Sequence, residues 1–253
     1  MFKMIKYEYR KDMPLYVVVV ALIVALTMYL AFSILSGSEI NLAISIILFI
    51  LCGWGAVIFI MVIGVISYAR EINSKSSFMT FMTPLNAFEI VGCKYITLII
   101  TTILATALYI GGAYLNITLA LFKFEEINDV MEMVDYLLVY FESNLTDVIA
   151  TFLVLIFSIW FSILMTVSYA YLAITLSSTI LANKRGKGWL AVGLYMGISV
   201  TSNIVSTILP RFDFGDSFAE LLISQWPVFI FQVLMIAGTY FGVSLLLKKK
   251  VSL

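Results

Sequence analysis

Long apolar segments, separated by shorter polar ones, dominate the pattern along this chain of 253 residues. Six of these segments contain no charged residue and no histidine, and they cover 15–36, 43–68, 95–121, 148–177, 189–209 and 226–247. Because a helix rises about 1.5 Å per residue and the hydrocarbon core of a bilayer is roughly 30 Å thick, each segment is long enough to cross a membrane. The pattern therefore predicts an all-α polytopic membrane protein, with six transmembrane helices forming one transmembrane domain over 1–253.

The basic residues lie almost entirely at one set of ends of these segments. Of the 15 Lys and Arg residues, only Lys123 and Arg211 lie at the opposite ends, where most of the acidic residues are found. Basic residues next to transmembrane helices favour the cytoplasmic side. The distribution therefore places both termini in the cytoplasm, and an even number of spans agrees with that topology.

The first 13 residues mix basic side chains with bulky ones. Lys3, Lys6, Arg10 and Lys11 stand among aromatic and aliphatic residues. This composition predicts an interfacial helix over 1–13 that lies at the membrane surface and runs into the first span at Pro14. A positive flank that only fixes the orientation of the first span explains the same residues.

Two longer regions lie on the predicted outer side. Residues 122–147 are acidic, and their apolar residues recur at helical spacing, which predicts an amphipathic helix within this external loop. A solvated acidic face is the simpler interpretation of the same charges. Residues 199–227 are moderately polar around Pro210, which predicts a fifth span that ends early and continues as a partly inserted hairpin.

A charged connector, residues 71–82, joins the second and third spans. It begins with polar residues and ends with mainly apolar ones, which predicts a short helix with one apolar face at the membrane surface. Thr83 suits an N-cap and Pro84 suits the first position of the next helix. An ordinary interfacial turn is the alternative.

Several kinds of chemistry are missing from the sequence. The six apolar segments lack ionisable groups, which argues against a proton- or ion-coupled carrier. The chain has no histidine, so neither a Ser-His-Asp triad nor an HExxH zinc motif is possible. Residues 186–188 lack the glycine spacing and the hydroxyl residue of a phosphate-binding P-loop. We therefore expect no catalytic residue, no metal site and no bound cofactor on this chain.

Small residues recur at a spacing that favours close packing of helices. Gly193 and Gly197 form one GxxxG pair, and Gly238 and Gly242 form another. Such pairs let two helices approach closely, either within the chain or between subunits, and we favour packing within the chain.

Hydroxyl side chains also align on one face of the fourth span. Ser158, Ser162 and Thr166 are spaced four residues apart and lie above one another on a helix. They are candidates for lining a mildly polar path. Hydrogen bonds from these hydroxyls back to their own helix are the favoured alternative.

Taken together, the topology and the connector resemble the ABC type-2 permeases, the membrane subunits of ATP-binding cassette exporters. The resemblance rests on six spans with both ends inside, a basic N-terminal helix, and an Arg70-Glu71 step after the second span. It continues through 76–85 and then through Ile90-Val91 and Lys94. The family typically has a Leu-Pro-like step at the end of the connector helix, where this chain has Thr83 before the proline.

The resemblance implies that residues 71–82 are the coupling helix, which sits in a groove of a separate ATPase subunit. It implies ATPase contacts through Glu71, Lys75, Ser76, Phe78, Met79 and Phe81. A second cytoplasmic contact is implied for Lys184, Arg185 and Lys187, although topology alone explains those charges. ATP and Mg²⁺ would then bind to the partner, so this chain would not itself be an enzyme.

The resemblance further implies a complex of two permeases and two cassette ATPases, in which the second permease is another copy of this chain or a paralogue. An apolar, uncharged path suits a hydrophobic or amphipathic substrate better than an ion or a sugar. We therefore expect a permease that exports an amphipathic, antimicrobial or toxin-like peptide, or another hydrophobic compound, across a bacterial cytoplasmic membrane. The alternative is a membrane sensor or immunity protein that binds a peptide without transporting it. The expected surroundings are the lipid bilayer, and no nucleic acid partner is expected.

Overall fold

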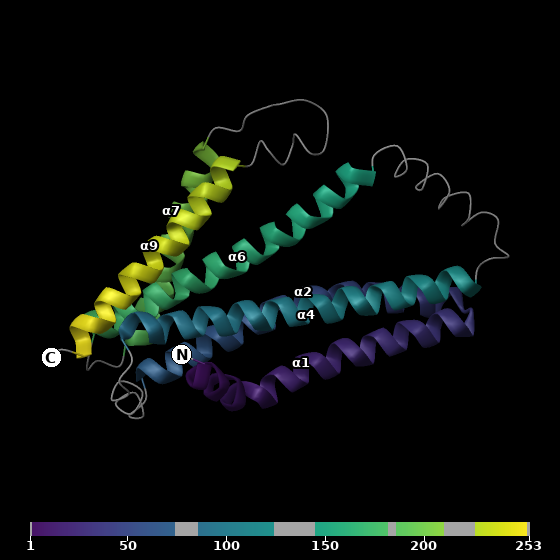
Figure 1. The fold of residues 1–253 in the computed structure, drawn as a ribbon, viewed down its shortest axis with the longest axis horizontal. Helices are drawn as coiled ribbons and strands as arrows, with labels where there is room; N and C mark the ends of the chain where they lie inside the picture. The colour runs from purple at the N-terminus through teal and green to yellow at the C-terminus, as the bar shows by residue number, and fades with distance from the viewer. Residues whose placement is uncertain (1, 74–85, 124–144, 182–185, 210–225, 252–253) are drawn as a thin grey trace. The chain divides into compact units, whose positions relative to one another are not determined.

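The fold is helical throughout the residues that the computed structural model describes, which are 2–73, 86–123, 145–181, 186–209 and 226–251. The helices are α1 (Phe2–Ser36), α2 (Glu39–Asn73), α4 (Ala87–Lys123), α6 (Leu145–Ile180), α7 (Lys187–Ile208) and α9 (Trp226–Val251), shown in Figure 1. All six are long and apolar enough to cross a membrane. The predicted all-α architecture with six membrane-spanning helices is therefore confirmed.

The N-terminal residues continue directly into the first span. Pro14 lies inside α1, which is one helix of 35 residues, so the residues expected to form a surface helix are its first three turns. Proline lacks the N–H that would bond to the carbonyl four residues earlier, and it is the usual cause of a helix kink.

A single glycine sets the short turn between α1 and α2. Gly37 has a φ angle of 69°, in the left-handed region that side chains with a Cβ rarely adopt. The first turn of α2 follows directly, because the N–H of Leu42 donates to the carbonyl of Ser38 at 3.0 Å.

The structure describes the start of α4 from Asn86 onward. Asn86 lies outside the helix, and α4 begins at Ala87. The side chain of Glu89 accepts the backbone N–H of Asn86 at 3.1 Å, and the N–H of Glu89 donates to the Asn86 carbonyl at 2.9 Å. This reciprocal arrangement resembles a capping box, which satisfies exposed donors at a helix start. Thr83 and Pro84 themselves lie outside the described residues.

The backbone divides into two compact units. The first unit comprises Met1–Lys11, Met61–Ile99 and Ala150–Leu253, and the second comprises Asp12–Ile60 and Ile100–Ile149. Both units contain parts of α1, α2 and α4, because each of these helices passes from one unit into the other.

Apolar contacts hold the second unit together. Leu30, Ile34 and Phe49 are buried, and partly buried hydrophobic residues pack against them. The rings of Phe49 and Tyr109 stack at 4.5 Å, and α1, α2 and α4 run side by side (Figure 1).

The first unit has its own core of tightly buried side chains. Val91 of α4, Val167 and Tyr171 of α6, and Val243 and Leu247 of α9 are all nearly inaccessible to solvent. A glycine permits a close approach of α4 to α2 in this unit, because a Cβ at Gly64 would lie 3.2 Å from a methyl group of Leu98.

Two of the predicted outer features fall largely outside the described residues. For the acidic loop 122–147, the structure describes only its two ends, which are the last residues of α4 and the first of α6. The fifth span does not end early, because α7 is one helix from Lys187 to Ile208 and includes the polar residues after Ser199. Residues 210–225 of the predicted hairpin lie outside the described part.

Candidate functional site: an ion-pair cluster and a tyrosine network

Four charged side chains from three helices meet in the first unit. The Lys94 ammonium of α4 lies 2.8 Å from a Glu71 carboxylate oxygen and 3.0 Å from one of Glu8. The other oxygen of Glu71 lies 2.8 Å from the ammonium of Lys11. We call Glu8, Lys11, Glu71 and Lys94 the ion-pair cluster.

The ion-pair cluster is buried as well as closely paired. The side chains of Lys94 and Glu8 are each only 4% exposed, and that of Glu71 is 12% exposed. Removing a charge from water is costly, and a buried charge is tolerated when an opposite charge and hydrogen bonds compensate it. Two carboxylates and two ammonium groups balance here, so the four residues depend on one another.

Local helix geometry explains how these residues come together. Glu8 and Lys11 are three residues apart in α1, which places them on the same face of the helix. Glu71 occupies the last turn of α2, and Lys94 lies two turns into α4. The cluster therefore joins the two helices on either side of residues 74–85 and ties both to the N-terminal turns.

A second contact reinforces the attachment of α1. The phenol of Tyr9 donates to the backbone carbonyl of Thr97 at 3.3 Å. Because Tyr9 and Glu8 are neighbours and Thr97 follows Lys94 by three residues, the start of α1 is held to α4 at two adjacent points.

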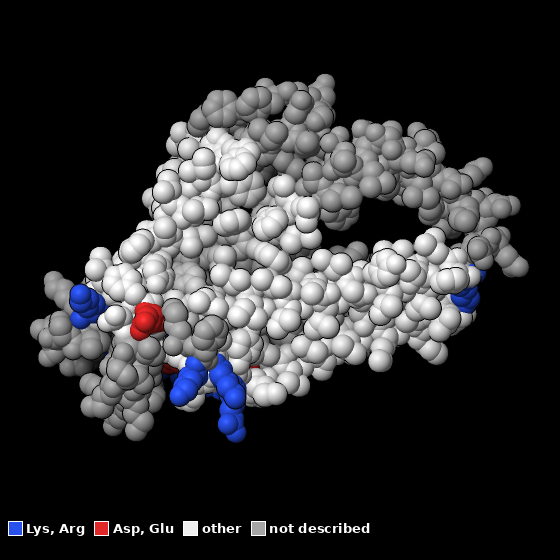
Figure 2. All heavy atoms as spheres, in the orientation of Figure 1, with Lys and Arg blue, Asp and Glu red and all other residues white. Residues whose placement is uncertain are grey.

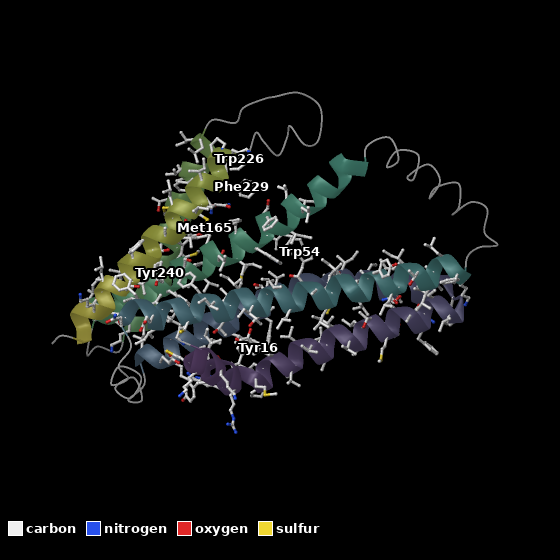
Figure 3. All side chains as sticks on the ribbon, viewed as in Figure 1. Tyr16, Trp54, Met165, Trp226, Phe229 and Tyr240 are labelled. Atoms are coloured by element: carbon white, nitrogen blue, oxygen red, sulfur yellow. The ribbon has the colours of Figure 1, made fainter. Side chains whose placement is uncertain are left out.

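Directly beside the cluster lies a set of four tyrosines from four helices: Tyr68, Tyr95, Tyr171 and Tyr240. Tyr68 and Tyr171 stack with ring centroids 4.1 Å apart. Tyr95 meets Tyr171 edge-on at 5.6 Å and Tyr240 edge-on at 5.8 Å. Tyr240 is labelled on α9 in Figure 3. We call this set the tyrosine network.

Two phenols of the network bond to side-chain hydroxyls. Each of these hydroxyls also donates to a backbone carbonyl of its own helix. The Thr175 hydroxyl donates to the carbonyl of Tyr171 at 2.7 Å, so it accepts a hydrogen bond from Tyr68 at 2.6 Å. In the same way, Tyr95 donates to Ser168 at 2.8 Å. Buried phenols need such partners, because an unpaired one loses its hydration without compensation.

The remaining two phenols bond to backbone carbonyls. Tyr240 of α9 donates to the carbonyl of Phe88 in α4 at 2.8 Å, and Tyr171 of α6 donates to that of Gly64 in α2 at 3.3 Å. The tyrosine network therefore joins α2, α4, α6 and α9 through oriented bonds as well as through ring contacts.

The chemistry of this site is structural. Among the described residues, no group of three or more His, Cys, Asp or Glu side chains is placed to hold a metal ion. The ionised groups neutralise one another, and the phenols donate to hydroxyls or carbonyls. The site is suited to holding helices in register and to carrying a displacement from one helix to its neighbours.

The structure places only part of the connector expected to contact an ATPase. Glu71 belongs to the last turn of α2 and is a member of the ion-pair cluster. The other expected contacts, Lys75, Ser76, Phe78, Met79 and Phe81, lie outside the described residues, as do Lys184 and Arg185. Lys187 is the first residue of α7.

Three hydroxyl residues were expected to line a path, with hydrogen bonds back to their own helix as the favoured alternative. One of the three shows such a bond. Thr166 donates back to the carbonyl of Ser162 in its own helix at 2.8 Å. Ser158, Ser162 and Thr166 are partly or fully exposed along α6. A role for them in lining a path stays a prediction.

The two GxxxG pairs have different surroundings. At Gly193, Gly197 and Gly238, an added Cβ would meet no atom of the described part within 4 Å. At Gly242, it would lie 3.5 Å from a methyl group of Leu172 in α6. Close approach within the chain is therefore seen at Gly242 only, and contact between subunits at the other three stays a prediction.

Sequence reasoning assigned Lys94 to a family pattern but did not identify its ionic partner Glu8 or the tyrosine network. Glu8 carries a signal that pointed to it, because it is an acid within a mainly basic segment and stands three residues before Lys11. The tyrosines carry no such signal, since they are scattered among 14 in the chain.

Comparison with known proteins adds no identification. No family model matches the chain, and neither the curated proteins nor the solved structures contain a significant match.

Proposed function

We propose that this chain is the membrane-spanning permease subunit of an ATP-driven exporter of the ABC type. The observation that carries the proposal is the ion-pair cluster. Glu71 is the first residue of the predicted coupling helix and Lys94 lies beyond its end, and their ion pair clamps the two helices that the connector joins. A push on the connector would therefore reach both helices together.

The cluster and the network give a physical route for that push. Glu71 follows Tyr68 by three residues on α2, and Lys94 directly precedes Tyr95 on α4. A displacement of either helix end would load the Tyr68–Thr175 bond to α6 and the Tyr240–Phe88 bond to α9. Packed cores and networks of oriented bonds transmit displacement because they have few alternative arrangements.

The proposed division of labour follows from what the residues can do. ATP and Mg²⁺ bind to two separate cassette ATPase subunits, and this chain supplies the path together with a second permease, which is a copy or a paralogue. The substrate is a hydrophobic or amphipathic compound, with an amphipathic peptide the first choice, because the six predicted spans are free of charge. The setting is a bacterial cytoplasmic membrane with both termini inside.

The test is to purify the chain from the membranes of its host and to ask whether a nucleotide-hydrolysing partner accompanies it. In the reconstituted complex, replacing Phe78 and Phe81 by Ala should abolish the dependence of ATP hydrolysis on this chain, because the predicted apolar face of the coupling helix is lost.

A matched control uses two exposed phenylalanines far from the connector in the sequence. Phe32 is 70% exposed and Phe122 is 80% exposed, and replacing both by Ala should leave coupling intact. If no ATPase accompanies the chain, or if the Phe78/Phe81 variant couples as well as the control, the proposal is wrong. Peptide binding without any ATPase would favour the sensor or immunity protein.

A further inference from the structure

The first three turns of α1 have two unlike faces. One face carries Glu8 and Asp12, both almost fully buried. The other carries Lys3, Lys6 and Arg10, all exposed. Residues three or four apart share a helix face, so the three cations form one stripe rather than a scattered charge. We call Lys3, Lys6 and Arg10 the basic stripe.

The basic stripe is not neutralised within the described part of the chain. The three salt bridges found there use Lys11 and Lys94, and none uses a residue of the stripe. Figure 2 shows basic side chains projecting near the N-terminus from a surface that is otherwise mostly uncharged. The uncompensated charge points to an anionic partner.

Two further exposed side chains indicate what kind of anionic partner the basic stripe binds. Tyr7 is 64% exposed and Met13 is 59% exposed, and both lie on the same side of the helix as the stripe. Cations flanked by an amphipathic ring and an apolar chain are typical of a helix at the boundary between headgroups and hydrocarbon.

The position of the basic stripe along the chain also favours a partner at the membrane surface. The stripe ends at Arg10, and the charge-free segment begins at residue 15, just beyond Pro14. Clusters of basic residues next to a span attract the anionic lipids of the leaflet. Pro14 permits a change of direction there, so the stripe is able to lie along the headgroups.

We propose that the basic stripe is a binding surface for the headgroups of anionic phospholipids. Docking on the leaflet presses the opposite face of the same helix, with Glu8 and Lys11, against Lys94 and Glu71. Anionic lipid therefore stabilises the ion-pair cluster. The proposal needs only a membrane-embedded chain and does not depend on the exporter function.

The test compares the full chain in lipid nanodiscs made of phosphatidylcholine alone with nanodiscs in which about a third of the lipid is phosphatidylglycerol. Anionic lipid should raise the unfolding temperature of the wild type by several degrees, and added salt should weaken the effect because it screens surface charge. Replacing Lys3 and Lys6 by Gln should remove most of this increase, whereas replacing both by Arg should keep it.

A control with the same loss of charge uses Lys187→Gln with Lys248→Gln, at the ends of α7 and α9. This variant should keep the wild-type response. Co-purified phosphatidylglycerol, measured as its ratio to phosphatidylcholine, gives a readout that does not depend on stability, and it should fall about twofold or more only in the Lys3/Lys6→Gln variant. An unchanged ratio in that variant, or an equal fall in the control, overturns the proposal. Loss of ATPase co-purification with unchanged lipid binding would assign the stripe to a protein partner instead.

Discussion

The two units of this protein hold their helices together by different means. In the first unit, phenols and charged groups link one helix to another, as in the bond from Tyr68 to Thr175 and the pair of Lys94 with Glu8. In the second unit, helices meet mainly through apolar side chains around Leu30, Ile34 and Phe49. Among the phenols there, Tyr109 donates to the Phe49 carbonyl at 3.2 Å.

This difference separates two ways of stabilising helices in a membrane. Lipid tails are as apolar as the side chains they surround, so association depends on close packing and on bonds between polar groups. Polar bonds specify one arrangement but fail steeply when one partner is lost. Close packing depends on shape and loses stability when a methyl group is added or removed. The unit whose helices flank the connector is the one in which the described charged side chains pair between helices.

The largest effect should come from breaking the ion-pair cluster at its centre. Replacing Lys94 by Met removes the ammonium shared by Glu8 and Glu71 and leaves both carboxylates buried without their common partner. Breaking a buried pair on one side typically costs about 3–5 kcal/mol. The unfolding free energy in mild detergent, measured by denaturant titration, should fall by that amount.

A compensating variant tests whether charge imbalance is the cause. Lys94→Met combined with Glu8→Gln leaves Glu71 paired with Lys11, so the charges of the cluster balance again, and this variant should recover most of the lost stability. A double variant as unstable as Lys94→Met alone would show that the lysine stem, rather than its charge, matters to the first unit.

The contrast between the units also shows which features of the fold the sequence predicts. Charge-free segments predict all six helices, because the period and length of apolar residues are local features. Glu71 and Lys94 stand out locally for the same reason, since each is a charge at the edge of an apolar segment. The ends of the helices were less well predicted, as with α4, whose first turns include Glu89 and Lys94 and precede the apolar segment.

The contacts between helices could not be predicted from the sequence, because they join residues that are distant in the chain. Glu8 and Lys94 are 86 positions apart, and Tyr68 and Thr175 are 107 apart. Nothing in the neighbourhood of a tyrosine says which other helix its phenol will face.

The second unit should be most sensitive at a close contact between α1 and α4. A Cβ added at Gly112 would overlap the methyl group of Thr27. Thr27 cannot turn freely to make room, because its hydroxyl donates to the Val24 carbonyl at 2.8 Å. Gly112→Ala should therefore lower the unfolding free energy by about 1–3 kcal/mol, as overpacking usually does.

The matching rescue is Thr27→Ser, which removes the methyl group and keeps the hydroxyl. Combined with Gly112→Ala, it should restore the unfolding free energy to near the wild-type value, measured by the same denaturant titration. No recovery in the double variant would mean that Gly112 is needed for backbone reasons rather than for space. Gly55, where an added Cβ would meet no described atom within 4 Å, provides a neutral Gly→Ala control.

The smallest effect, and the one that tests the comparison most directly, is the loss of a single phenol in each unit. Tyr68→Phe keeps the ring stacked on Tyr171 but removes the 2.6 Å bond to Thr175. Because the Thr175 hydroxyl retains its bond to the Tyr171 carbonyl, no buried donor is stranded, and the expected cost is about 1 kcal/mol. Tyr109→Phe removes a longer bond of 3.2 Å in the second unit and should cost less. The unfolding free energies of the two variants, measured side by side, test whether a phenol bond stabilises the first unit more than the second. If Tyr109→Phe is the more damaging, the polar bonds of the first unit are not what distinguishes it, and ring packing in both units explains the helix contacts.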